Sequence, residues 1–264
     1  MTTFFLNRLA TEPHALAFAG QSTPWPVALA DQTTDPSLDE ALRGHVAAAG
    51  RLLTPVAADL LATTGRPVDL FGFEPNPARL GAAAAASASV PGIALTQLGA
   101  LLDAAALGYN PAQAKPVAVL GHSQGVLAVH MVQAICEAGS IDAAAAKIDE
   151  ILAIATLIGV AGTRQARQLG LAARHGEATP MLSVKDITRA QVDALIERVD
   201  GARGPIAVAV TNSATHYVLS GYPEDLAAFG VEVAKEHKRQ AKLREEKVRG
   251  GRVFDPTLEY LDVT

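Results

Sequence analysis

The run Val-Ala-Val-Leu-Gly-His-Ser-Gln-Gly at residues 117–125 decides the fold of this chain. Its first four residues are apolar, which is typical of a short β-strand covered on both faces. A helix-compatible run follows at residues 126–138 and ends before Gly139. Between strand and helix lies a Gly-x-Ser-x-Gly turn. This order predicts a nucleophile elbow, in which Ser123 projects from a strained turn at the edge of a sheet.

Each residue type in the turn has a physical reason. Gly121 and Gly125 leave room for the backbone to close on itself. Ser123 lies at a helix N-terminus, where free N–H groups and the helix dipole favour negative charge. The backbone N–H of Gln124 is placed to stabilise an oxyanion. His122 adjoins the serine on the same turn and is badly placed as its base, so we interpret it as a packing residue.

Strands and helices alternate through the first two thirds of the chain, which predicts an α/β core with a mostly parallel sheet. Ser37 and Glu40 form a capping box that starts a helix. The expected elements are a strand at residues 15–19, a helix from Ser37 to about Pro55, a linker-like stretch at 66–88, a helix from 89 to about 107 and an apolar helix at 148–162.

The order of the expected strands and helices changes near residue 180. The expected elements are a strand at 181–184, a helix at 188–199, strands at 206–210 and 216–219, a helix at 223–246 and a strand at 258–263. This β-α-β-β-α-β order is the ferredoxin-like pattern. We therefore predict an α/β protein with an α/β-hydrolase-like parallel-sheet core at residues 1–178 and a ferredoxin-like α+β subdomain at residues 179–264.

The composition and motifs of the chain argue against several classes of function. The chain has 264 residues, 49% of them hydrophobic, and a net charge of −5, which gives no basic field to hold nucleic acid or an anionic membrane. Neither a secretory signal nor a membrane-spanning apolar run is present. The lone Cys136 is interpreted as a small buried hydrophobe. No Cys/His cluster with metal spacing and no phosphate-binding glycine loop occurs. We predict a cytoplasmic protein without metal or nucleotide.

Beyond the elbow, the sequence resembles the malonyl/acetyl-CoA:ACP transacylase family, and specifically the acetyltransferase domain of type I fatty acid synthases. The resemblance covers nearly the whole chain, with two departures: Ser22 replaces the third residue of a Gly-Gln-Gly loop, and Val126 replaces a glutamate. It is carried by Ala-Phe-Ala-Gly-Gln-Ser at 17–22 with Trp25, Ser-Val-Pro-Gly at 89–92 with Thr-Gln at 96–97, the elbow at 121–129, Val-Thr-Asn-Ser at 210–213, Val-Leu-Ser-Gly at 218–221, and residues 247–256.

The resemblance implies a ping-pong acyl transfer that primes fatty acid synthesis. Ser123 takes the acyl group from acyl-coenzyme A and passes it to the phosphopantetheine thiol of an acyl carrier protein, beside the other domains of a multifunctional synthase. The N–H groups of Gln21 and Gln124 hold the oxyanion, and Asn212 supports the site. No cofactor is bound by this segment, because coenzyme A enters as substrate and phosphopantetheine belongs to the partner.

A serine hydroxyl needs a base to become a good nucleophile. The histidines after the elbow are His130, His175, His216 and His237, and each is interpreted as solvated or packed. In the family, the catalytic histidine follows the last strand of the subdomain in a Phe-His-Ser or Phe-His-Thr run. The chain ends at residues 261–264, before such a run. The resemblance therefore implies a domain truncated before its catalytic histidine.

The acyl group is expected to be acetyl. Malonyl-selective relatives carry an arginine on the helix that follows the elbow helix, and its guanidinium pairs with the free carboxylate. Residues 151–162 contain no basic residue, and the nearest candidates are Lys147 before them and Arg164 after them. Three alternatives stay open: a malonyl or palmitoyl transferase of the same family, a serine esterase or thioesterase, and a fragment with only a structural role.

Overall fold

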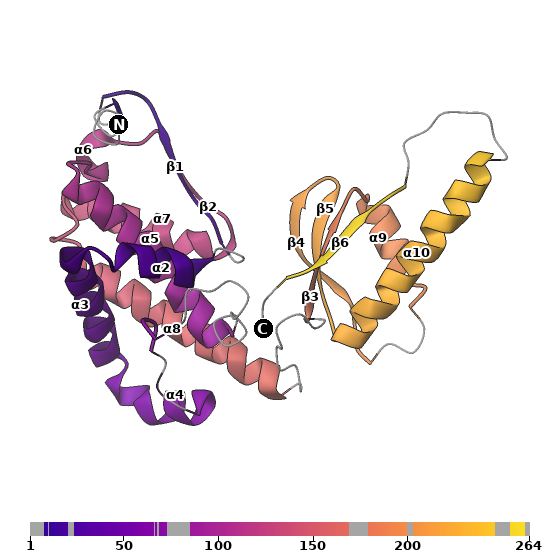
Figure 1. Ribbon diagram of the computed structural model, residues 1–264, viewed down its shortest axis with the longest axis horizontal. Helices are drawn as coiled ribbons and strands as arrows, with labels where there is room; N and C mark the ends of the chain where they lie inside the picture. The colour runs from indigo at the N-terminus through magenta and orange to yellow at the C-terminus, as the bar shows by residue number, and fades with distance from the viewer. Residues whose placement is uncertain are drawn as a thin grey trace. The chain divides into compact units, whose positions relative to one another are not determined.

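The computed structural model describes residues 8–9, 11–20, 24–65, 67, 69–72, 85–168, 179–199, 203–245 and 254–261. The chain divides into two compact units, Met1–Gln165 and Ala166–Thr264 (Figure 1). Each unit has a hydrophobic core of its own.

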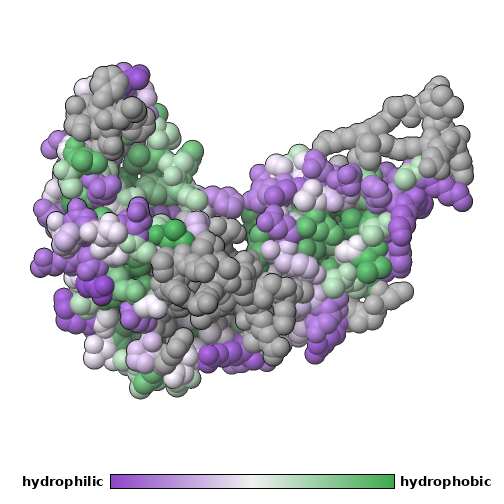
Figure 2. Space-filling model, in the orientation of Figure 1, coloured by the Kyte–Doolittle hydropathy of each residue, from purple (hydrophilic) through white to green (hydrophobic). Residues whose placement is uncertain are grey.

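A parallel strand pair carries the elbow in the first unit. Strand β1 (Ala15–Phe18) pairs with β2 (Ala118–Gly121) from Ala15↔Ala118 to Phe18↔Gly121 (Figure 1). The predicted parallel pairing is confirmed, but the predicted cover on both faces is wrong. Val117 is 72% exposed and Leu120 is 59% exposed, and apolar surface lies beside this strand pair in Figure 2. A continuous apolar run favours a buried strand, but the run alone does not establish packing on both faces.

Helices make up most of the first unit. The predicted elbow helix is confirmed with its expected bounds as α7 (Val126–Ala138). It ends where Gly139 adopts a left-handed φ of 88°. The elements are α2 (Trp25–Gln32), α3 (Pro36–Leu52), η1 (Thr54–Val56), α4 (Ala57–Thr64), α5 (Ala86–Ala106), α6 (Pro111–Ala114), η3 (Ser123–Gly125), α7 (Val126–Ala138) and α8 (Ala145–Gln168).

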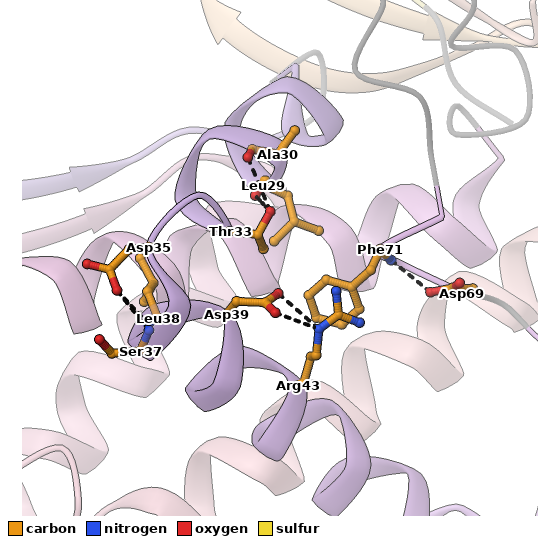
Figure 3. A network of polar contacts seen from close by, with 10 residues as sticks. All are labelled: Leu29, Ala30, Thr33, Asp35, Ser37, Leu38, Asp39, Arg43, Asp69 and Phe71. Atoms are coloured by element: carbon orange, nitrogen blue, oxygen red, sulfur yellow. Dashed lines mark hydrogen bonds and ion pairs between the residues drawn. The ribbon is translucent and has the colours of Figure 1, made fainter.

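The N-terminus of α3 differs from the expectation. Asp35, not Ser37, is the N-cap, and its carboxylate accepts the backbone N–H groups of Ser37 at 2.8 Å and Leu38 at 3.3 Å (Figure 3). Hydrogen bonding from Ser37, and then from the two backbone N–H groups, lowers the pKa of Asp35. The capping box of Ser37 and Glu40 predicted the wrong N-cap. Pro36 occupies the first helical position, where proline is well accommodated, so the N-cap is the residue before it.

A short segment is attached to the middle of α3. The Arg43 guanidinium donates to the Asp39 carboxylate at 2.9 Å and lies 4.1 Å from the centre of the Phe71 ring (Figure 3). This cation–π contact holds residues 69–72 against the helix. Farther along, α3 ends at Leu52, and a turn containing Pro55 leads into α4, as the proline predicted.

Helix α5 is the central helix of the first unit. It starts at Ala86, earlier than expected, although its N-cap Ala85 provides no side-chain hydrogen bond. Instead, the hydroxyl of Thr163 on α8 accepts the N–H of Ser87 at 2.9 Å. The helix is long and apolar enough to cross a membrane, but 67% of its most apolar window is buried inside the unit, as in the core helix of a soluble protein. The bent pair formed by α3 and residues 54–64 passes the same test as one span.

Helix α8 is longer than the predicted range 148–162 at both ends, so Arg164 belongs to the helix rather than to the segment after it. The apolar residues Ile154, Leu157 and Ile158 are 49%, 41% and 51% exposed. Their spacing puts them on one face of the helix. This face of α8 is therefore apolar and accessible within the first unit.

The second unit has the predicted ferredoxin-like fold. Its four strands form an antiparallel sheet in the order β4-β5-β3-β6, and both helices cover one face of it (Figure 1). The core between sheet and helices includes Leu182, Leu219 and Phe229. The elements are β3 (Met181–Lys185), α9 (Arg189–Ile196), β4 (Ala207–Ser213), β5 (His216–Ser220), α10 (Pro223–Glu245) and β6 (Thr257–Tyr260).

A buried carboxylate links the two helices of this unit. Glu236 on α10 is 7% exposed and accepts hydrogen bonds from Arg239 at 2.9 Å, Gln240 at 2.9 Å and Arg198 at 3.0 Å. Arg198 follows α9, so the contact joins the end of one helix to the middle of the other. These hydrogen bonds, that of Arg239 above all, lower the pKa of Glu236 to about 2.

This depressed pKa predicts acid sensitivity of the second unit. The stabilisation from ionised Glu236 is fully present above its unfolded-state value of 4.5 and is lost as the pH falls towards about 2. We expect Glu236→Gln to lower the free energy of unfolding at neutral pH by roughly 1–3 kcal/mol and to flatten its dependence on pH below 4.5. Urea unfolding at several pH values measures both effects. Glu224→Gln, at an exposed ion pair, is the control, and equal losses in the two variants would contradict the prediction.

Candidate active site

The serine of the elbow has the strained backbone that the sequence predicted. Ser123 has a φ of 53°, in the left-handed region that residues other than glycine seldom adopt. His122 before it is extended, and the N–H of Gly125 closes the turn by donating to the His122 carbonyl at 2.9 Å. The Ser123 side chain is exposed. The turn therefore presents a hydroxyl to solvent at the point where α7 begins.

Steric contact explains both glycines of the motif. A Cβ on Gly121 would lie 2.6 Å from the carbonyl of Gly125 and from the nitrogen of Val126. A Cβ on Gly125 would overlap the backbone carbonyl of Phe18 in β1. The turn thus closes on itself and packs, backbone to backbone, against the neighbouring strand.

The loop after β1 lies directly against the nucleophile. A Cβ on Gly20 would be 2.7 Å from the Cβ of Ser123 and 3.2 Å from the nitrogen of Gln124. Gln21, the predicted partner in the oxyanion site, follows Gly20 but lies outside the described residues. The nitrogen of Gln124 belongs to the first turn of a helical stretch, where N–H groups have no partner within the helix.

Sequence reasoning underestimated Gln97. It entered only as part of a matching motif, but its Nε2 donates to the carbonyl of Ala19 at 2.5 Å, next to Gly20. Gln97 is 8% exposed, and its Oε1 has no hydrogen-bond partner among the described residues, as is also true of the Oε1 of Gln124. The available signal was an amide side chain in a mostly apolar helix, because a buried amide needs a partner.

The histidines lie in varied surroundings. His122 and His130 are exposed in the first unit, so the interpretation of His122 as a packing residue is wrong. In the second unit, His216 Nε2 lies 3.0 Å from Ser183 Oγ and 3.4 Å from Asn212 Nδ2, next to a register irregularity in β4. His237 Nδ1 is 2.7 Å from the Phe254 carbonyl oxygen. These contacts agree with packed or solvated roles. The fourth candidate, His175, lies outside the described residues.

Two basic residues were candidates for binding a substrate carboxylate, and both are paired. Arg164 Nη2 donates to Asp59 Oδ2 at 2.5 Å and to Thr63 Oγ1 at 3.0 Å, which ties α8 to α4. Lys147 Nζ donates to Glu150 Oε2 at 2.7 Å, and this hydrogen bond raises the pKa of the lysine. The carboxylates of the protein thus already neutralise both cations.

Two further points concern reactive groups. Among the residues that the structure describes, His, Cys, Asp and Glu side chains do not gather in threes around a potential metal position.

Cys136 is exposed, so its interpretation as a buried hydrophobe is wrong. It lies on the solvent side of α7, whose opposite side packs into the core. Partial desolvation, and then the nearby Glu137, raise the pKa of its thiol.

In comparisons with known proteins, the match to a protein-family model lies in the second unit. Residues 180–260 match a family model described as the fatty acid synthase central AT domain. The fatty acid synthase beta subunit hexB of Dothistroma septosporum (strain NZE10 / CBS 128990) is 30% identical over an alignment of 128 residues, and the match covers 44% of this chain and 7% of that protein. The chain thus spans a small part of this relative. Both matches confirm the resemblance to a fatty acid synthase acyltransferase domain that the sequence motifs indicated.

Solved structures show more distant similarity. A malonyl CoA-acyl carrier protein transacylase from Coxiella burnetii is 17% identical with a TM-score of 0.49, over 85% of this chain and 58% of that one. The corresponding transacylase from Clostridium perfringens is 16% identical with a TM-score of 0.48, over 96% of this chain and 61% of that one.

Proposed function

We propose that the chain carries the nucleophile of an acyltransferase that moves a short acyl group, by preference acetyl, from coenzyme A to an acyl carrier protein in fatty acid synthesis. The observation that carries the proposal is the strained Ser123, exposed at the start of α7 and packed against the loop after β1. Cytoplasmic location and action beside other synthase domains are part of the same proposal.

In the first half-reaction, Ser123 Oγ attacks the thioester carbonyl of acyl-coenzyme A. The carbon–sulfur bond breaks, the acyl group forms an ester with Ser123, and the serine proton leaves with the coenzyme A thiol. The N–H of Gln124, and that of Gln21, which follows Gly20 in the sequence, stabilise the oxyanion that forms on the way. Contact between Gly20 and the elbow supports this pairing, because it puts the two backbone segments side by side.

In the second half-reaction, the phosphopantetheine thiol of the carrier attacks the ester. The carbon–oxygen bond to Ser123 breaks, the acyl group leaves as a thioester, and the proton returns to the serine. Gln97 supports both steps indirectly, since its amide holds the Ala19 carbonyl and with it the loop of the oxyanion site. No histidine of the chain is assigned as the base.

The experiment is to detect the acyl-enzyme directly. After incubation with acetyl-coenzyme A, intact-mass analysis should find one added acetyl group, and peptide mapping should place it on Ser123. Addition of a phosphopantetheinylated carrier protein should then transfer the acetyl group to the carrier thiol. Release of free acetate without a carrier would indicate a hydrolase, and an acetyl group that maps to a residue other than Ser123 would contradict the proposal.

Acyl selectivity gives a separate prediction. Malonyl should be disfavoured against acetyl by more than about tenfold, because burying a malonyl carboxylate against the apolar face of α8 without a partner would cost several kcal/mol. With equal acetyl- and malonyl-coenzyme A, the adduct on Ser123 should be acetyl. Arg164→Ala should leave this ratio unchanged, since Asp59 and Thr63 already hold the guanidinium.

Arg167→Ala, on the last turn of the same helix, is the matched control for loss of a positive charge. A dominant malonyl adduct that disappears only in Arg164→Ala would contradict the acetyl assignment and make Arg164 the carboxylate-binding residue.

A further inference from the structure

The first unit contains a cavity that the proposed chemistry does not use. Its volume is about 360 Å³, within the range of about 300–1,000 Å³ that small-molecule pockets occupy. None of its lining residues belongs to β1, the elbow or α7. Its walls come from α3, α4, α5, α8 and the residues Pro67 and Leu70. The main apolar side chains of the helical walls are Val46, Leu53, Leu60, Pro91, Leu152 and Val160.

Among the residues that the structure describes, the lining is almost entirely apolar and carries no charged side chain. Two of its three hydroxyl-bearing residues are satisfied by their own helices: Thr64 donates to the Leu60 carbonyl and Thr156 to the Leu152 carbonyl, both at 3.0 Å. These hydroxyls therefore do not require a polar ligand. An ion inside the cavity would lose its hydration without gaining a partner, so the part of a ligand that enters must be uncharged.

The cavity opens to solvent through an apolar rim. Leu61 lines it and is 47% exposed, and Gly50 and Ala57 on the facing helices are exposed lining residues. A ligand can thus bury an apolar portion while a charged end stays in water. One helical turn beyond the lining residue Val160, Arg164 is held by its ion pair with Asp59.

We propose that this cavity binds a single unbranched alkyl chain, such as the tail of a medium-chain fatty acid, with the carboxylate left at the mouth. The volume of the cavity, the lack of charge among its described lining residues and its exposed apolar rim all favour this class of ligand. The site is independent of acyl transfer, because Ser123 does not line it.

Calorimetric titration with free fatty acids below their micelle concentrations tests the proposal. The titrated protein is the full chain with Ser123→Ala, so that the result does not depend on acyl-enzyme formation. Affinity should rise about fourfold for each added methylene from hexanoic through octanoic to decanoic acid. 1-Decanol should bind as tightly as decanoic acid. No detectable binding, or affinity that does not depend on chain length, would overturn the proposal.

Two glycines of α3 provide a matched pair of variants. A Cβ on either Gly50 or Gly44 would meet nothing within 4 Å, but only Gly50 lines the cavity. Gly50→Leu should fill the cavity and weaken decanoic acid binding by about tenfold or more, whereas Gly44→Leu should bind like the parent chain. Ala57→Leu, from the facing helix α4, should weaken binding as Gly50→Leu does. Circular dichroism checks that all variants keep their helix content, and equal affinities across the set would refute the site.

Discussion

Replacement of Ser123 by alanine is expected to abolish the covalent acyl adduct while leaving the fold intact. The change removes one oxygen from an exposed side chain, and without that oxygen no ester can form. Loss of a serine nucleophile typically lowers catalytic rates by several orders of magnitude, with only residual activity from the oxyanion site. Intact-mass analysis after incubation with acetyl-coenzyme A should therefore find unmodified protein.

Thermal unfolding separates this outcome from misfolding. The midpoint of Ser123→Ala should match that of the parent chain, because the substitution removes only an exposed hydroxyl and leaves the turn in place. Ser37→Ala, on the exposed first turn of α3, controls for serine removal in general and should keep the adduct. An acetyl group that remains on Ser123→Ala and maps to another residue would refute the assignment of the nucleophile.

Gly125→Ala should be the most damaging small change in the elbow. The added methyl group would overlap the Phe18 carbonyl of β1, and neither partner is a flexible side chain that could move aside. We expect a loss of roughly 2–4 kcal/mol in the free energy of unfolding. Adduct formation should fall by at least about a hundredfold, because the turn must shift to relieve the overlap and small displacements of a nucleophile cost this much.

Gly44→Ala is the matched control, because a Cβ at Gly44 has open space. It should be neutral or slightly stabilising, as alanine is the better helix former. Urea unfolding and adduct kinetics on both variants give the two measurements. Wild-type adduct formation in Gly125→Ala would show that the close approach of β1 to the elbow has no role in the chemistry.

The elbow was predictable because its signals are local. An apolar strand, two glycines around a serine and a helix ending at Gly139 all lie within one short run, and the structure has each of them in place. The ferredoxin-like order was also readable, because each strand and helix of the second unit has its own hydrophobic period.

The cap of α3 was misassigned because Ser37 and Asp35 both fit cap preferences, although Pro36 at the first helical position favours Asp35 as the cap. The remaining features depend on contacts between distant residues. The role of Gln97 depends on the carbonyl of Ala19, 78 residues away in sequence. Similarly, the pairing of Arg164 depends on Asp59, 105 residues away. Local patterns do not specify such partners.

The cap that Thr163 provides for α5 has a consequence for synthesis on the ribosome. Ser87 and Thr163 are 76 residues apart, and chains grow at about 5–20 residues per second. The first turn of α5 is therefore made roughly 4–15 seconds before the hydroxyl that caps it. During that interval, the central helix of the nascent first unit has neither its cap nor the packing of α8. The growing chain thus exposes its future core until translation has passed α8, and a nascent-chain chaperone would act within this window.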